Sequence, residues 1–94
     1  MAVLRIQHAV SDYNGWKQAL DSDPVGRQAG GVRHYQVLRS TTDPNFVMID
    51  LTFDDAPTAE AFLGKLRELW VGPGKAVMRD PQAWIVEPIE SADL

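Results

Sequence analysis

The period of the hydrophobic pattern changes several times along this chain, and the order of these changes limits the fold more than any other feature. Residues 2–10 alternate with a period of two, and residues 13–21 place apolar side chains three and four positions apart. Residues 32–39 and 46–53 return to strand patterns, and a second helical pattern precedes a last strand pattern over residues 83–89. The sequence therefore predicts strand, helix, two strands, helix and strand.

Capping and turn-forming residues support these boundaries. Residues 11–12 offer an N-cap for the first helix, and residues 54–55 place carboxylates at the start of the second. Residues 24–29 favour a short additional helical turn, and residues 40–45 predict the turn of a hairpin. The Gly-Pro-Gly sequence of residues 72–74 is expected to stop the second helix.

This order of elements is the split β-α-β arrangement of the α+β class. Right-handed crossovers place both helices on one face of a four-stranded antiparallel sheet with strand order 4-1-3-2. The chain has 94 residues, which is room for one domain, and no linker interrupts it. We therefore expect a single domain over residues 1–94.

Two helices on one face leave the other face of the sheet uncovered. In the expected register this face carries Tyr35, Val37, Met48, Asp50 and Trp84. A contiguous apolar surface is a usual sign of an interface, and a small domain without cysteine gains stability from oligomerisation. The sequence therefore predicts a homodimer in which the two sheets pack against each other.

Asp50 interrupts an otherwise apolar strand, and a carboxylate there must be paired or solvated. Arg33 or Arg39 is expected to reach it, which makes structural pairing at the dimer interface the favoured interpretation. A general base with a raised pKa is the alternative.

Composition and charge exclude several classes of partner. The formal net charge is -4 and the basic residues are scattered, whereas nucleic acid or an anionic membrane needs a clustered basic face. No apolar run approaches the roughly 20 residues of a membrane span, and Arg5 and His8 interrupt the first apolar stretch, unlike a signal peptide. We expect a cytoplasmic protein with no nucleic acid and no membrane as partner. The absence of cysteine excludes disulfides and thiolate chemistry.

The two histidines are the most informative polar residues, because imidazole titrates near neutral pH. Pairing Arg39 with Phe46 across the hairpin places His34 on the helix-facing side, opposite a leucine. His8 points to the same side. If the first strand runs parallel to the third, the end of the first strand lies beside the start of the second, and both histidines are then at one end of the sheet. The two are then expected about 10 Å apart as a catalytic pair. The alternative is that His8 forms a hydrogen bond with a neighbouring backbone group or with Asp12, and that His34 is a partly exposed strand residue.

Aromatic and apolar side chains recur on the two helices and the third strand. They could line a pocket for a small hydrophobic or aromatic molecule, or they could simply fill the core. No short ligand spacing supports a metal site, and none is expected. The candidate substrate-binding residues are Tyr13, Trp16, Leu51, Phe62, Leu66 and Trp70.

Several short motifs resemble one known group of proteins. They are Arg5-x-x-His8-x-Val10-x-Asp12-Tyr13-x-x-Trp16, Gly31-Val32, Leu38-Arg39, Asp43-Pro44-Asn45 and Ala59-x-Ala61-Phe62. On these residues the chain resembles, over nearly its whole length, the dimeric α+β barrel superfamily that includes the antibiotic-biosynthesis-monooxygenase-like proteins. The resemblance implies a ferredoxin-like fold and a barrel formed by two copies. It leaves the chemistry open, because the superfamily includes monooxygenases, haem-degrading enzymes, isomerases and cyclases.

Three hypotheses of function follow from the resemblance and the two histidines. The first is a cofactor-independent monooxygenase that holds an aromatic or polyketide-like substrate, with His8 or His34 assisting its deprotonation. The second is a proton-transfer cyclase or isomerase that uses the same residues without oxygen. The third is a dimeric binding protein without chemistry. No bound cofactor is expected, and the Asn, Trp and His set of the haem-degrading members has no convincing match here.

Overall fold

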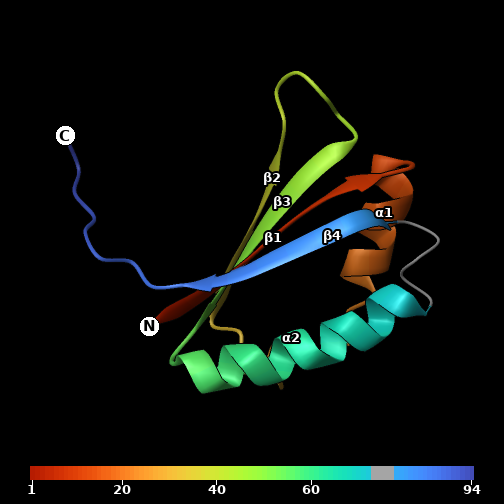
Figure 1. Ribbon diagram of the computed structural model, residues 1–94. Helices are drawn as coiled ribbons and strands as arrows, with labels where there is room; N and C mark the ends of the chain where they lie inside the picture. The colour runs from red at the N-terminus through yellow and green to blue at the C-terminus, as the bar shows by residue number, and fades with distance from the viewer. Residues whose placement is uncertain (73–77) are drawn as a thin grey trace.

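The computed structural model describes residues 1–72 and 78–94 and has the order of strands and helices that the sequence predicts (Figure 1). The predicted bounds are confirmed for the first strand, the first helix and the third strand. The elements are β1 Ala2–Val10, α1 Tyr13–Asp21, β2 His34–Arg39, β3 Phe46–Phe53, α2 Ala56–Val71 and β4 Met78–Val86.

The four strands form one antiparallel sheet in the order β2-β3-β1-β4, which confirms the predicted order. Both helices pack on one face of this sheet (Figure 1). The C-terminal arm, residues 87–94, has no helix or strand and runs away from the sheet. The chain therefore has the ferredoxin-like α+β arrangement.

Aspartates cap both helices at their first turn. The Asp12 carboxylate accepts a hydrogen bond from the Gly15 N–H at 2.9 Å, and Asp55 accepts one from the Thr58 N–H at the same distance. At the end of α2 the Gly72 N–H donates to a carbonyl of the last turn. The rest of the expected Gly-Pro-Gly stop lies outside the described residues.

Alternate residues of the two central strands form the covered face of the sheet. Leu4 and Ile6 of β1 are buried on the same side as Leu51 and Phe53 of β3, as the period-two pattern predicts. They pack against α2, where the ring centroid of Phe62 lies 5.5 Å from that of Phe53. Burying each such side chain contributes about 1.5–3 kcal/mol, so this layer holds the helices to the sheet.

The register of the β2–β3 hairpin differs by one residue from the expected register. Ser40 and not Arg39 lies opposite Phe46, because the Ser40 N–H donates to the Phe46 carbonyl at 3.0 Å. The Ser40 hydroxyl also accepts from the N–H groups of Thr42 and Asp43, which fixes the turn. The hairpin loop therefore lies between Ser40 and Phe46, and it is one residue shorter than the loop expected between Arg39 and Phe46.

This shift reverses the facing of every side chain in β2. Tyr35 pairs with Leu51 and Val37 pairs with a buried residue of β3, so both point toward the helices. The Arg27 guanidinium lies 4.5 Å from the centre of the Tyr35 ring on that side. The expected place of Tyr35 and Val37 on the uncovered face is therefore wrong.

The last strand also differs from its expected range. β4 begins at Met78, not at residue 83, and ends at Val86, not at residue 89. A break is expected at Pro81 because proline has no N–H for the ladder, but the strand continues through an irregularity in its pairing with β1. Pairing with the last residues of β1 extends β4 at its N-terminal end.

The connection between α1 and β2 contains one short helical turn, as residues 24–29 predict, but the turn starts at Gly26 and not at Pro24. The Gly30 N–H donates to the Gly26 carbonyl at 2.9 Å and closes this turn, whereas the Gly26 N–H donates back to the Asp23 carbonyl at 3.1 Å. Gly26 has a φ of 77°, which is incompatible with a continuous helix. The second strand correspondingly starts at His34, not at residue 32.

Gly31 should tolerate substitution poorly. Its φ is +97°, and a Cβ added there would approach Thr58 Cγ2 to 2.6 Å. Gly31→Ala should therefore lower the free energy of unfolding by about 1–3 kcal/mol, measured by urea denaturation. Gly64→Ala is the control, because a Cβ there meets nothing within 4 Å and alanine raises helix propensity by up to about 1 kcal/mol. Equal effects of the two substitutions would contradict the expected strain.

Candidate functional site

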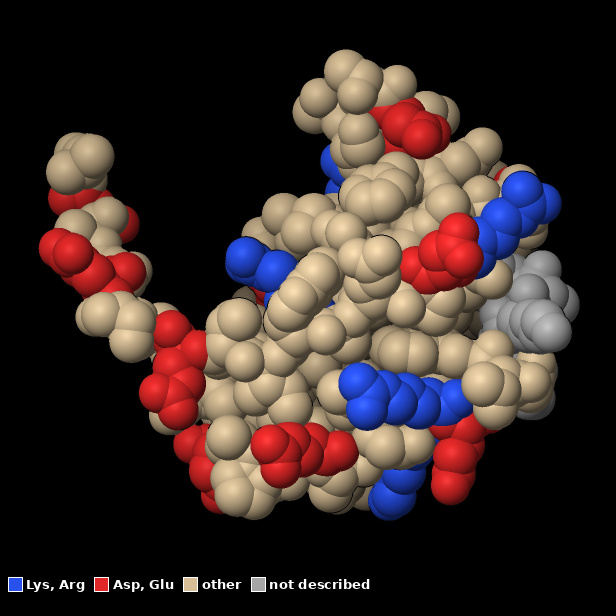
Figure 2. Space-filling view, viewed as in Figure 1, with Lys and Arg blue, Asp and Glu red and all other residues tan. Residues whose placement is uncertain are grey.

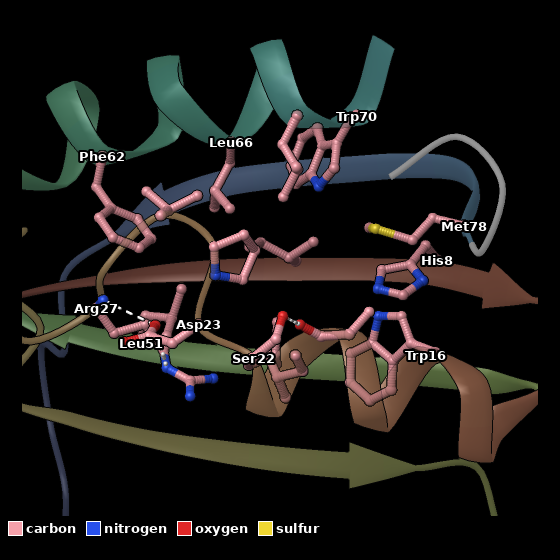
Figure 3. A pocket seen from close by; sticks show the side chains of 17 residues that line it. His8, Trp16, Ser22, Asp23, Arg27, Leu51, Phe62, Leu66, Trp70 and Met78 are labelled. Atoms are coloured by element: carbon pink, nitrogen blue, oxygen red, sulfur yellow. Dashed lines mark hydrogen bonds and ion pairs between the residues drawn. The ribbon is translucent and has the colours of Figure 1, made fainter. Parts of the chain in front are cut away.

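A cavity of about 250 Å³ lies between the sheet and the two helices (Figure 3). Its walls come from β1, α1, the segment after α1, β3, α2 and the start of β4. An apolar cavity of about 150 Å³ accommodates a benzene ring, so this one can hold a molecule of one or two rings. Of the expected substrate-binding residues, those that line the cavity are Trp16, Leu51, Phe62, Leu66 and Trp70.

Tyr13 is the expected substrate-binding residue that does not line the cavity. Its ring packs beside Trp16, with centroids 5.9 Å apart, and the Arg39 guanidinium lies 4.6 Å from its centre. The cation–π contact joins the start of α1 to the end of β2. Tyr13 therefore packs behind Trp16, and its contacts join α1 to β2 without reaching the cavity.

His8 is the buried polar residue at one end of the cavity. It points from β1 toward the helices and is 2% exposed. Figure 3 shows its ring between Trp16 and Met78. The imidazole and indole rings meet edge to face with centroids 5.3 Å apart. His8 is thus fixed by packing on both sides.

A β-bulge in β4 lies directly opposite His8. The register of β1 and β4 shifts there, so residues 80–81 together oppose a single residue of β1. The bulge accommodates Pro81, which cannot donate to the ladder. Met78 comes just before the bulge and lines the cavity next to His8.

The hydrogen bond of His8 determines its tautomer. Nδ1 lies 3.2 Å from the Ala9 carbonyl oxygen, which can only accept, so Nδ1 carries the hydrogen and Nε2 keeps a lone pair. Burial lowers the pKa of His8 below its ordinary value because the imidazolium loses hydration, while the bond to Ala9 acts in the opposite direction. The backbone bond foreseen as an alternative is therefore present, and it leaves a neutral imidazole with Nε2 as an acceptor.

The other end of the cavity has polar residues that the sequence patterns did not indicate. Asp23 and Arg27 come from the segment between α1 and β2, and Figure 3 shows Arg27 on the side of Phe62, away from His8. Arg27 Nε lies 3.2 Å from Asp23 Oδ1 as an ion pair. An acidic and a basic residue four positions apart around a glycine were the available signal.

His34 does not lie near His8. It pairs with Thr52 on the uncovered face, because the hairpin register is shifted by one residue. β1 also runs antiparallel to β3, so His8 pairs with Val47, and Val47 pairs in turn with Arg39 at the far end of β2. The expected placement of the two histidines together on the helix-facing side is therefore wrong.

Asp50 lies on the uncovered face as expected, but its partner is Arg5 of the neighbouring strand. Arg5 Nε and Nη2 donate to the two carboxylate oxygens, both at 2.9 Å. The expected partners bind elsewhere, since Arg33 pairs with Asp54 and Arg39 lies over an aromatic ring of α1. Both oxygens of Asp50 are thus engaged by Arg5, which favours structural pairing of β1 with β3.

Several apolar side chains remain on the uncovered face. Met48 pairs with Leu38 across the hairpin, and Trp84 and Val86 are on β4. Trp84 is 44% exposed and Leu38 is 40% exposed. The C-terminal arm, residues 87–94, stands off from the body and carries acidic side chains (Figure 2). This face therefore presents an apolar patch to its surroundings.

Within residues 1–72 and 78–94, no group of three His, Asp or Glu side chains could hold a metal ion. Over the same part of the chain, no helix combines the length and the apolar character needed to cross a membrane.

Comparisons with known proteins bear on the fold. No protein-family model matches the sequence, and no curated protein matches it. A variant of SnoaB, a cofactor-independent oxygenase from Streptomyces nogalater, is 11% identical with a TM-score of 0.71 and covers 96% of this chain and 94% of its own. A provisionally assigned antibiotic biosynthesis monooxygenase from Deinococcus radiodurans is 17% identical with a TM-score of 0.71 and covers 100% of this chain and 98% of its own. NE2512 from Nitrosomonas europaea, a protein of unknown function, is 16% identical with a TM-score of 0.75 and covers 99% of this chain and 92% of its own.

These likenesses define the class of fold. The structural neighbours include antibiotic-biosynthesis-monooxygenase-like proteins, and the chain shares their ferredoxin-like fold, as the resemblance to the dimeric α+β barrel superfamily implies. Identities this low show the fold alone, because one fold hosts many unrelated reactions. The substrate and the reaction have to be argued from the cavity.

The buried, neutral His8 should make stability depend on pH. Its pKa is lower in the folded chain, so as the pH falls the unfolded state takes up a proton first. The free energy of unfolding should therefore decrease as the pH drops through about 6.5, by up to about 1.4 kcal/mol per pH unit, and level off below the folded-state pKa. Urea unfolding between about pH 5 and pH 8 measures this decline.

Two histidine variants separate the contribution of His8 from that of other groups. His8→Asn should lose this part of the decline, whereas His34→Asn, altered on the uncovered face, should keep it. The same decline in wild type and His8→Asn would show that His8 is not the group responsible.

Proposed function

We propose that this protein binds a compact aromatic or polyketide-like molecule in the cavity and deprotonates it with His8, so that the anion reacts with oxygen without a bound cofactor. The observation that carries the proposal is a buried imidazole with Nε2 as an acceptor at the end of an apolar cavity. A general base must be unprotonated and within reach of the substrate proton. The chain shares its fold with the cofactor-independent oxygenase SnoaB, and because one fold hosts many reactions, the choice of this reaction rests on His8 and the cavity.

The cavity wall supports a flat and mostly apolar substrate. Trp16 and Trp70 lie on α1 and α2, and Figure 3 shows both indole nitrogens on the cavity side. Aromatic rings pack well against planar molecules, and each indole N–H can donate to a substrate oxygen. A ring held between them is shielded from water while it is deprotonated.

The proposed reaction begins when a substrate hydroxyl gives its proton to His8 Nε2. The electron-rich anion then reduces dioxygen, one oxygen atom enters the ring as a carbonyl, and the other leaves as water. A dihydroxynaphthalene would give a hydroxynaphthoquinone in this way, with the substrate as the source of all the electrons. His8 returns its proton when the water forms.

Oxygen uptake with a panel of dihydroxynaphthalenes tests this function. The wild-type protein should consume oxygen above the spontaneous rate and form product with quinone absorbance. His8→Asn should lower the rate at least about 100-fold, because general-base catalysis contributes that much or more. His34→Asn is the control and should leave the rate unchanged, because His34 lies on the uncovered face.

Two results would contradict this assignment. A rate unaffected by His8→Asn would exclude His8 as the base. Conversion of substrate without oxygen uptake would instead indicate a proton-transfer cyclase or isomerase that uses the same cavity.

We also propose that two copies of the chain pack through the uncovered face to form one barrel. Trp84 and Met48 would lie in this interface, and the Arg5–Asp50 pair already neutralises the charge on the same face. The C-terminal arm leaves the body with Ile89 91% exposed, which supports a neighbouring chain beside it. Burying such apolar area stabilises association by about 25 cal/mol per Å² before its costs.

The mass in solution tests this assembly. At micromolar concentration, light scattering should give twice the 10.5 kDa of one chain. Trp84→Glu should give a monomer, because a two-fold interface would bring two carboxylates into an apolar contact. Val71→Glu is the control, because Val71 is also an exposed apolar residue but lies on α2, away from the proposed interface. A wild-type monomer at this concentration would contradict the proposed dimer.

A further inference from the structure

Arg27 is held more firmly than an ordinary surface arginine. The backbone N–H of Arg27 donates to Asp23 Oδ1 at 2.9 Å, and the side-chain Nε lies 3.2 Å from the same oxygen. Its carbonyl accepts from the Val32 N–H at 3.0 Å, and its guanidinium lies over the Tyr35 ring. Backbone and side chain are both fixed, so little rotamer freedom remains to be lost when a ligand binds.

One donor of this fixed arginine has no partner among the residues that the structure describes. Arg27 Nη1 is buried and makes no hydrogen bond with any residue that the structure describes, while the side chain as a whole is 15% exposed. Leaving a buried donor unpaired is unfavourable, and more so for a charged group. Because Arg27 lines the cavity, a molecule bound there can supply the missing acceptor.

We propose that Arg27 Nη1 binds an anionic oxygen, a carboxylate or phenolate, on the molecule that occupies the cavity. The inference rests on the proposed function, because it requires a ligand in the cavity. Asp23 compensates the arginine charge only in part, because it pairs through one oxygen and its side chain is 41% exposed to screening water. A second anionic oxygen is therefore still attracted, and a guanidinium binds it by charge-assisted hydrogen bonds.

Arg27 and His8 together would fix the orientation of the ligand. Figure 3 shows Arg27 on the side of Phe62 and His8 on the side of Met78, with apolar side chains between them. A planar molecule held through its acidic oxygen at Arg27 presents its other end to the imidazole. The substrate class is thereby narrowed to aromatic molecules with an acidic oxygen remote from the proton that His8 removes.

Calorimetric titration of 2-naphthoate and 2-methylnaphthalene at about pH 7.5 tests the proposal, because the two probes differ in the anionic group. Arg27→Met keeps most of the apolar stem and removes the donors. It should weaken 2-naphthoate binding at least about tenfold, the loss of one charge-assisted hydrogen bond, and change 2-methylnaphthalene binding by less than about twofold. Arg33→Met is the control, because Arg33 also belongs to an Arg–Asp pair but is exposed and does not line the cavity. This variant should leave the binding of both probes unchanged.

Asp23→Asn gives a second test with the opposite sign. Asparagine tolerates the φ of 55° at this position and keeps an acceptor for Arg27, but it removes the compensating charge. It should therefore tighten 2-naphthoate binding at least about threefold. This variant keeps the proposal testable if Arg27→Met fails to fold.

The outcomes separate this proposal from the proposed function. If wild type binds neither probe, the cavity is not a binding site for such molecules, and both proposals fail. If wild type binds both probes but Arg27→Met weakens them equally or not at all, the anchoring role alone is wrong. Weaker or unchanged 2-naphthoate binding by Asp23→Asn would also overturn it.

Discussion

The pairing of the two central strands, β1 and β3, is the interaction on which the rest of the structure depends. Their alternate residues form both the layer that packs against the helices and the floor of the cavity. His8 belongs to the same row as Leu4 and Ile6, so the alternation that buries these residues also buries the imidazole and lowers its pKa. The chemistry of the site thus follows from a polar residue placed in an apolar row.

Much of this frame could be predicted, because the hydrophobic period reports burial directly. β1, α1 and β3 have the predicted bounds, since their apolar residues recur without ambiguity. β2 offers an apolar residue to either face, Val37 to one and Leu38 to the other, so the period does not decide its register. The hydroxyl of Ser40 decides it by organising the turn, and a single local hydrogen-bonding group leaves no periodic signal.

The candidate site was predictable in its apolar part and not in its polar end. Trp16 and Phe62 lie at helical spacing with other apolar residues, which is why they could be expected at the sheet. Arg27 lies in a segment of turns whose path depends on the positive φ of Asp23 and Gly26 and on side-chain bonds to the backbone. Binding residues often lie in such connecting segments, where neither period applies.

Comparison of the Arg–Asp pairs indicates where a charge is available to a ligand. Arg5 and Asp50 meet through two hydrogen bonds on the uncovered face, so each satisfies the other. Arg33 and its aspartate are both 68% exposed, so water satisfies what the pair leaves over. Arg27 has neither advantage, because its aspartate offers one oxygen and its Nη1 is buried. An arrangement of this kind is stable only as far as the fold holds it, and the cavity beside it is the place from which an acceptor can come.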